Sequence, residues 1–476
     1  MLPAAELFPF FLPMLLLSVG IVLTLVSEPF LEPMRKHRIL PVIGTGSLLA
    51  AMASFALVPA GDWHGILQID GPRALMGLTV LVAAILGLAG LQQKLGEEEF
   101  AGGEPYILML LATAGALLMT QATSSLSLFI GMELASLPIY ALVGLRRKEE
   151  MGLEALFKYF VMGAVFSAVF LYGASLLYGA TGTLRFAAET VPGREIYYFA
   201  GAILVSVGLL FKAGVAPFHF WTADAYAGAP TPVTGFMASV VKVGSLVALG
   251  TLWMSWFGSH IMVVGNLFRL VILLGLLSVA VGAFSGLGQT RARRLMAFSS
   301  ISHAGFLLFA LFPTTSKLGM ASLSNLWYYL VTYVLATSVV LSGLSALTGK
   351  NDENDGLKAL AGAGKANPLL GGTLCVALAS LAGFPPAAGF LAKFNVLATL
   401  VAPDGELVLA TTIIAGLLLL LAMVGAVYYI RLAVVLWNEP ETVRAPVTVR
   451  PLLAFAVSAA SILLILALFF PGRFGA

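Results

Sequence analysis

Apolar runs that are long enough to cross a membrane repeat from one end of the chain to the other. A helix needs about 20 apolar residues to cross about 30 Å of hydrocarbon. We therefore expect an all-α polytopic membrane protein with about fourteen transmembrane helices, and no connection is long enough to form a soluble catalytic domain. The fourteen runs are 7–27, 39–59, 74–93, 105–121, 124–145, 154–179, 197–216, 231–255, 261–284, 294–312, 318–348, 367–384, 407–436 and 451–471.

Two of these runs end in similar Gly/Pro sequences. The seventh is followed by AGVAPF at 213–218, and the twelfth by AGFPPA at 382–387. Each predicts a broken helix, with short helical extensions at 218–228 and 386–400. The two breaks lie five spans apart, so equivalent spans would cross in opposite directions. This is the pattern of inverted repeats, in which broken helices mark an ion pathway. The repeats would be spans 4–8 and 9–13.

These repeats predict the domain organisation. We expect an N-terminal three-helix segment at 1–104, a first five-helix repeat at 105–255, a second at 256–436 and a C-terminal helix at 437–476.

Composition supports a membrane location. The 476 residues are 59% hydrophobic and 10% charged, against about 45–50% and about 25% in soluble proteins. This excludes a cytosolic enzyme, a disordered chain and a nucleic-acid binder. Most Lys and Arg residues, such as Arg146, Arg147 and Lys148, follow odd-numbered spans. The positive-inside rule therefore places those loops in the cytoplasm and both termini outside.

Ionisable residues within the spans are the candidates for function. A charge at the centre of a bilayer costs about 2.5–3.5 kcal/mol on insertion scales, so it usually faces protein or water. The candidates are Glu133, Lys158, Lys212, Lys242, His303 and Lys393.

A buried lysine can carry a proton. Removal from water lowers the pKa of an ammonium group, and a nearby carboxylate raises it. Moving that carboxylate would therefore switch a lysine between holding and releasing its proton. Glu133 with Lys212 would make such a pair, and Lys242, His303 and Lys393 could extend it into a relay across the membrane. Such a relay needs no metal, nucleotide or covalent intermediate.

Simpler interpretations remain open. Lys158 lies near the start of its span, and its side chain could reach the interface between membrane and water. His303 could be a hydrogen-bonded core residue, and the deep charges could be structural ion pairs. The sequence contains no phosphate-binding loop, dinucleotide fingerprint, HExxH or paired CxxC motif, and Cys375 is the single cysteine. We therefore expect no cofactor or metal in this chain.

Four segments resemble the antiporter-like membrane subunits of respiratory complex I (NADH-quinone oxidoreductase) and Mrp-type cation/proton antiporters. They are LLFKAGVAPFHFWTADAYAGAPTPVTGFMASVVKVG, FIGMELASLPIYALVG, RRLMAFSSISHAGF and SLAGFPPAAGFLAKF. The chain is most similar to the subunit N branch. It lacks the long lateral helix of subunit L, and it has Lys393 where subunit M has a glutamate.

The resemblance implies fourteen transmembrane helices with two inverted five-helix repeats, and it implies roles for individual residues. Glu133 and Lys212 would be the coupling pair, and Lys158 would modulate it. Lys242 would be the central relay residue, and Lys393 the terminal proton-transfer residue. The histidine of SSISHAGF is a weaker candidate.

The resemblance also implies a function. The chain would translocate protons in the bacterial inner (plasma) membrane, driven by quinone reduction elsewhere in the complex. FMN, iron–sulfur clusters and quinone would belong to partner subunits. Neighbours would be subunit M, small subunits such as K, and membrane lipids. One alternative is a subunit of an Mrp-type sodium/proton antiporter or a membrane-bound hydrogenase, which neighbouring genes would distinguish. The other is a structural spacer without transport.

Overall fold

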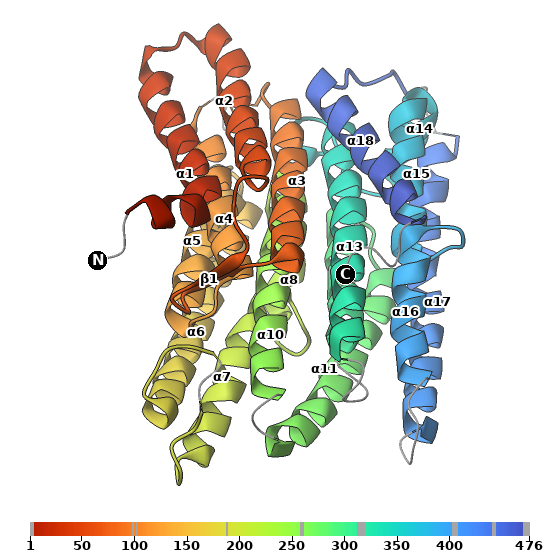
Figure 1. The fold of residues 1–476 in the computed structure, drawn as a ribbon. Helices are drawn as coiled ribbons and strands as arrows, with labels where there is room; N and C mark the ends of the chain where they lie inside the picture. Colours follow the sequence, from red (N-terminus) through yellow and green to blue (C-terminus); the bar gives the residue numbers. More distant parts are fainter. Residues whose placement is uncertain are drawn as a thin grey trace. The chain divides into compact units, whose positions relative to one another are not determined.

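Helices make up most of the described structure (Figure 1). This computed structural model describes residues 4–97, 100, 102–186, 189–257, 261–311, 319–401, 408–439 and 444–469. A helix lies in each of the fourteen apolar runs. The predicted all-α fold class is therefore confirmed. Both chain ends, on which the prediction of outward termini depends, lie outside the described residues.

The chain divides into two compact units. Unit 1 comprises Met1–Leu88, Glu98–Ala213 and Val240–Leu267. Unit 2 comprises Ala89–Glu97, Gly214–Ser239 and Phe268–Ala476.

In unit 1, α1 lies against α2 and α4, α4 packs against α5, and α6 packs against α7 (Figure 1). Ser124 caps the N-terminus of α5, because its side chain accepts a hydrogen bond from the backbone N–H of Ser127, as an N-cap serine does. The elements are α1 (Ala4–Ser27), η1 (Glu28–Phe30), α2 (Pro33–Ser54), α3 (Gly71–Gln93, whose last turns belong to unit 2), α4 (Glu104–Gln121), α5 (Ser125–Val143), α6 (Glu150–Thr181), α7 (Glu195–Ala213) and α10 (Lys242–Phe257).

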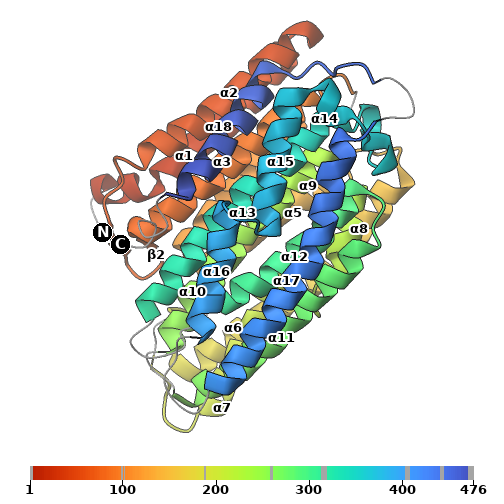
Figure 2. The ribbon, with the colours of Figure 1, turned by 90° about the vertical axis from the view of Figure 1, so that its right-hand side faces the viewer.

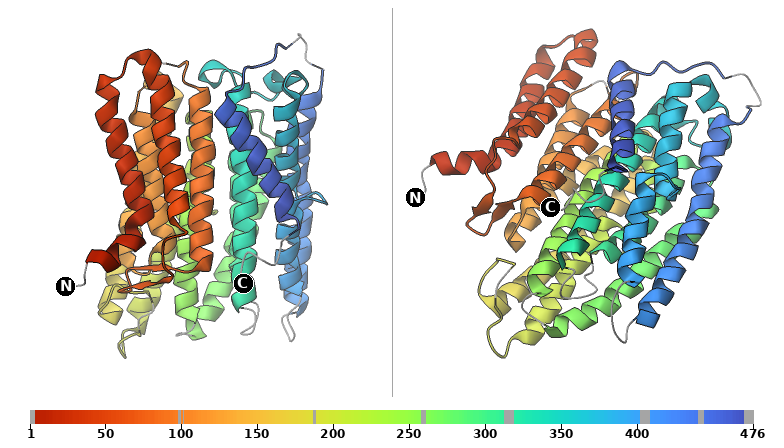
Figure 3. Two further views of the ribbon diagram at one scale, coloured as in Figure 1. Left: turned by 45° about the horizontal axis from the view of Figure 1, so that its top comes forward. Right: turned by 45° about the vertical axis from the view of Figure 1, so that its right-hand side comes forward.

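A short antiparallel hairpin in unit 1 departs from the all-helical expectation. Strand β1 (Gly61–Trp63) pairs with β2 (Leu67–Ile69) beside α1 (Figure 3). The Trp63 ring meets the Phe11 ring of α1 edge to face, with centroids 5.2 Å apart. Leu67 also forms a bridge with Ala122, so the hairpin contacts the connection between α4 and α5.

In unit 2, α13 packs against α15, α16 and α18, and α15 packs against α17 (Figure 2). The elements are α8 (Phe220–Gly228), α9 (Thr231–Phe236), α11 (Ile261–Leu287, which begins in unit 1), α12 (Ala292–Ala310), α13 (Gly319–Leu347), η4 (Lys350–Asp352), η5 (Lys358–Leu360), α14 (Ala363–Ala366), α15 (Pro368–Ala382), α16 (Ala388–Val401), α17 (Val408–Trp437) and α18 (Pro451–Ala467).

Among the described residues, nine helices are long and apolar enough to cross a membrane individually. The number is ten if Lys358–Ala366 and Pro368–Ala382, bent by 116°, form one span. The shorter apolar helices α16 and α18 account for part of the difference from fourteen.

Both predicted breaks are present. Helix α7 ends at Ala213, and Gly214 follows with φ of 70°. Helix α15 ends at Ala382, and Gly383 follows with φ of 81°. Glycine adopts this left-handed backbone without the steric cost of a Cβ. The expected extensions are α8 and α16.

The eighth span is also irregular. Between α9 and α10 the backbone forms one π-helical turn, η3 (Met237–Val241), and Lys242 is the first residue after it. Such turns often occur at functional sites.

Candidate functional site

Three lysines that the sequence singles out are buried. Lys212, Lys242 and Lys393 are 2%, 3% and 8% exposed. Lys212 lies in the last turn of α7, Lys242 begins α10, and Lys393 lies in α16 just after the second break. Each lysine therefore lies beside an interruption of regular helix, where backbone groups lack their usual partners.

Glu133 and Lys212 lie in unit 1 but have different partners. The Oε1 atom of Glu133 accepts a hydrogen bond of 2.5 Å from Ser167 of α6. The Nζ atom of Lys212 donates one of 2.8 Å to the hydroxyl of Tyr140 on α5. Within the part of the chain that the structure describes, no ion pair joins Glu133 to Lys212. Sequence reasoning missed both hydroxyl partners.

Lys158 of α6 lies in a different environment. Its side chain is 43% exposed and forms an ion pair of 2.6 Å with Glu154, one helical turn earlier. Pairs at this spacing stabilise a helix by about 0.2–0.5 kcal/mol. This position fits the interfacial interpretation, and the modulating role stays a prediction.

In unit 2, His303 of α12 lies among tyrosines. Its Nδ1 and Nε2 atoms each lie 3.1 Å from a tyrosine hydroxyl, those of Tyr329 and Tyr429. Tyr429 also bonds the hydroxyl of Ser299 at 2.5 Å. The Tyr333 ring lies 5.0 Å from the imidazole, and its hydroxyl donates to Ser300. Hydroxyls both donate and accept, so this group can pass a proton to or from the imidazole.

Lys393 is held by backbone oxygens. Its Nζ atom donates hydrogen bonds to the carbonyl oxygens of Leu381 and Ala382, at 2.8 and 3.1 Å. It also lies 5.5 Å from the centre of the Phe306 ring. These carbonyls end α15, where the helix dipole is negative and favours a cation.

A buried cluster of charges at the start of α9 was not predicted. Asp352 bonds Lys94 at 3.0 Å and lies 3.8 Å from Arg293. Arg293 pairs with Asp355 at 3.2 Å, and Lys94 lies 3.5 Å from Glu97. We call these five residues of unit 2 the Asp352 cluster. Buried charges of this kind must be paired to be tolerated.

The Asp352 cluster anchors the beginning of the eighth span. The two carboxylate oxygens of Asp352 accept hydrogen bonds from the side chain and backbone N–H of Thr231, at 2.7 and 3.0 Å. Thr231 begins α9. A carboxylate at a helix N-terminus satisfies free N–H groups and the helix dipole. The run NDEND at 351–355 could have signalled the cluster.

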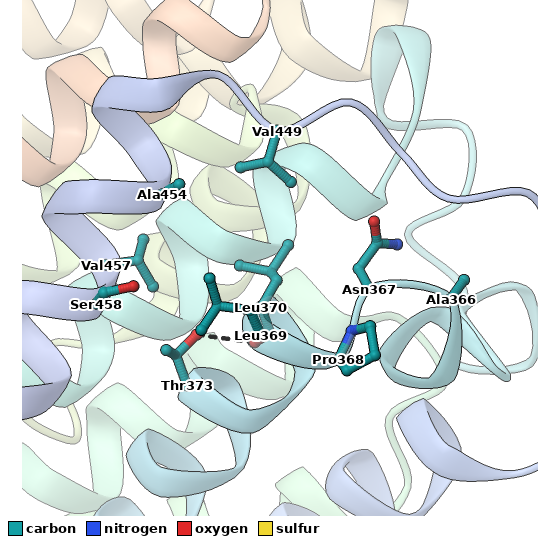
Figure 4. Close-up of a pocket in the computed structure, with 10 residues that line it drawn as sticks. All are labelled: Ala366, Asn367, Pro368, Leu369, Leu370, Thr373, Val449, Ala454, Val457 and Ser458. Carbon is teal, nitrogen blue, oxygen red and sulfur yellow. Dashed lines mark hydrogen bonds between the residues drawn. The ribbon is translucent and has the colours of Figure 1, made fainter.

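A surface pocket of unit 2 contains none of these charges. Its volume is about 260 Å³, and its lining includes Asn367, Leu370, Thr373, Val457 and Ser458 of α15, α18 and the residue before α15 (Figure 4). Within the described ranges, no group of three or more His, Cys, Asp or Glu side chains is placed to hold a metal ion.

Comparison with known proteins supplies the family. Residues 122–419 match the family model described as NADH:quinone oxidoreductase/Mrp antiporter, transmembrane. The chain is 33% identical over 436 residues to NADH-quinone oxidoreductase subunit N of Parvibaculum lavamentivorans, covering 90% of this chain and 87% of that protein. It is 39% identical over 373 residues to subunit 14 of Thermus thermophilus, covering 78% and 79%.

A solved structure agrees with this assignment. A chain of respiratory complex I from Thermus thermophilus matches with a TM-score of 0.80 and 33% identity, covering 97% of this chain and 98% of that chain. The chain belongs to the NADH:quinone oxidoreductase/Mrp antiporter transmembrane family.

Proposed function

We propose that this chain is the antiporter-like subunit N of a proton-translocating NADH-quinone oxidoreductase. The observation that carries the proposal is the burial of Lys212, Lys242 and Lys393 in a member of this family. Four charged candidates within the spans, these three and Glu133, exceed what packing needs, because each costs free energy to place in a membrane.

The buried residues have different roles in proton transfer. In unit 1, Glu133 and Lys212 form the coupling pair, which closes and opens as the complex turns over, and Lys242 is the central relay residue. In unit 2, Lys393 is the terminal transfer residue, and His303, which is hydrogen-bonded to two tyrosines, is a weaker relay candidate. An ammonium group with three hydrogens can exchange a proton with water or hydroxyl partners.

The remaining parts of the reaction belong to other subunits. Electron transfer to quinone, with its FMN and iron–sulfur clusters, takes place elsewhere in the complex, and this chain holds no redox site. Subunit M and small subunits such as K are its neighbours in a bacterial inner membrane. The loops rich in Lys and Arg face the cytoplasm, with both termini outside.

Proton pumping in membrane vesicles tests this function. The gene would replace that of subunit N in a bacterial host, and inverted vesicles would be driven by NADH with a short-chain quinone. We expect Lys242→Ala to abolish most of the pumping through this subunit while the complex still assembles. Lys365→Ala is the matched control, because this lysine is about half exposed and pairs with Glu439 on the surface.

Three outcomes would overturn the proposal. Undiminished pumping in Lys242→Ala and Glu133→Ala would favour the structural spacer. Sodium-dependent proton exchange without an electron donor would favour the Mrp-type antiporter. Turnover driven by hydrogen evolution would favour the membrane-bound hydrogenase.

A further inference from the structure

We infer that Tyr140 is a positioning residue that gives the Lys212 ammonium a second resting place, away from Glu133. This inference rests on the proposed function, because it concerns how the coupling pair opens. Gly163 makes the arrangement possible by leaving space for the tyrosine hydroxyl.

The contact between Lys212 and Tyr140 is close and buried. Lys212 Nζ lies 2.8 Å from the Tyr140 hydroxyl and 5.2 Å from the centre of the same ring. Both side chains are buried. A hydroxyl oxygen accepts a hydrogen bond from an ammonium group, and the ring face attracts the cation. The tyrosine thus holds the charge without adding a negative one.

The two alternative partners of Lys212 lie on one side of α5. Glu133 and Tyr140 are seven residues apart, which is about two helical turns or 10 Å along the axis. On α6, Ser167 bonds Glu133, and Gly163, about one turn away, lies beneath Tyr140. The interface between α5 and α6 therefore carries two separate acceptor positions, one charged and one neutral.

Gly163 is needed for the neutral position. A Cβ atom built on Gly163 would lie 1.9 Å from the Tyr140 hydroxyl oxygen, so any side chain at this position would force the hydroxyl to move. Tyr159 holds the Tyr140 ring from another side, with centroids 4.6 Å apart and the planes nearly perpendicular. The hydroxyl is consequently fixed in position, while Lys212 has a flexible four-carbon stem.

Lys212 therefore has two alternative states, one bonded to the Tyr140 hydroxyl and one bonded to the Glu133 carboxylate. At the hydroxyl, Lys212 is separated from Glu133, and Glu133 accepts from Ser167. At the carboxylate, the ammonium group forms an ion pair, which is strong in a medium of low dielectric constant. Without the hydroxyl, the pair would be closed for a larger part of each turnover, and opening it would limit proton transfer.

Tyr140→Phe removes the hydroxyl and keeps the ring. We expect NADH-driven pumping and coupled turnover in the vesicles to fall several-fold with normal assembly. Tyr178→Phe is the matched control, because Tyr178 lies on α6 with 53% of its surface exposed, and it should behave as the unmodified chain. Gly163→Ala should lower pumping in the same way, by displacing the hydroxyl.

A rescue separates positioning from packing. Glu133→Asp shortens the carboxylate by one methylene and weakens the closed pair, so it should restore part of the pumping lost in Tyr140→Phe. A merely structural tyrosine would give a double variant no better than Tyr140→Phe alone. An electron cryomicroscopy map of the Tyr140→Phe complex should also show Lys212 bonded to Glu133.

Failure of the proposed function can be distinguished from failure of the role inferred for Tyr140. If Lys212→Ala and Glu133→Gln both pump normally, the proposed function fails. If those variants stop pumping while Tyr140→Phe pumps normally, or Glu133→Asp gives no rescue, only the role of Tyr140 is overturned.

Discussion

Lys393 Nζ donates a 2.8 Å hydrogen bond to the carbonyl oxygen of Leu381, from the helix after the second break to the last turn of the helix before it. A second bond reaches Ala382 at 3.1 Å. Carbonyls at a helix C-terminus have no partner within the helix. The lysine and the end of α15 therefore satisfy each other, and backbone dipoles hold this charge.

Lys393→Met should remove both the transferable proton and the partner of these carbonyls. We expect proton pumping to fall and the free energy of unfolding to decrease by about 1–3 kcal/mol, because buried acceptors are left unsatisfied. Vesicle pumping and the midpoint of thermal inactivation measure the two effects. The surface variant Lys365→Met should change neither. Normal pumping in Lys393→Met would remove this residue from the relay.

Asp352→Asn should destabilise the chain without touching the buried lysines of the relay. Losing one partner of a buried ion pair costs about 3–5 kcal/mol, and Lys94 and Arg293 would both lose a carboxylate. The thermal denaturation midpoint of the purified complex should fall clearly. Glu32→Gln is the control, since Glu32 forms an exposed pair with Arg35.

The stability loss should be partly reversed by a paired change. Adding Lys94→Met to Asp352→Asn removes a cation together with the anion, so less charge remains uncompensated in the interior. A double variant as unstable as the single one would show that the hydrogen bonds of Asp352, and not its charge, hold this region.

Tyr429→Phe distinguishes a relay histidine from a core histidine. The change removes the hydroxyl that lies 3.1 Å from His303 Nε2 and 2.5 Å from Ser299 Oγ. We expect several-fold slower pumping with a modest stability loss of about 1 kcal/mol. Tyr172→Phe, at an exposed position, serves as the control. A loss of stability alone would assign His303 to the core.

Gly282→Ala should disturb the helix that carries His303. A Cβ on Gly282 would lie 2.5 Å from both the carbonyl oxygen of Phe298 and the backbone nitrogen of Ser302 on α12. Backbone must move to relieve such a contact, which typically costs about 1–3 kcal/mol. The level of assembled complex should drop. Gly416→Ala is the matched control, because nothing lies within 4 Å of its Cβ position.

The sequence predicted the helices and the buried charges for a simple reason. Apolar runs of membrane length indicate transmembrane helices directly. A lysine within such a run, such as Lys242, is rare because its charge is costly to place in a membrane, so it indicates a functional residue. The breaks were predicted equally well, because Gly214 and Gly383 take backbone angles that glycine favours. These features are local in the chain.

The partners of the charges could not be predicted in the same way. Tyr140 and Ser167 carry no charge, and hydroxyl side chains in apolar spans are ordinary. Lys94 and Asp352 lie in connections, where charges are normally solvated, and they are far apart in the sequence. Only the packing of distant segments brings them together.

The π-helical turn before Lys242 affects the direction in which this side chain points. A π-turn contains one residue more than an α-helical turn, and each residue rotates an α-helix by about 100°. Lys242, the first residue after the turn Met237–Val241, therefore follows it with a phase that differs by about 100° from that of an uninterrupted α-helix over the same residues. A regular α-helix formed by the same residues would rotate the ammonium group by about 100°, with Lys242 itself unchanged. The direction of this charge thus depends on the helix type of the turn that precedes it, Met237–Val241, as well as on the identity of residue 242.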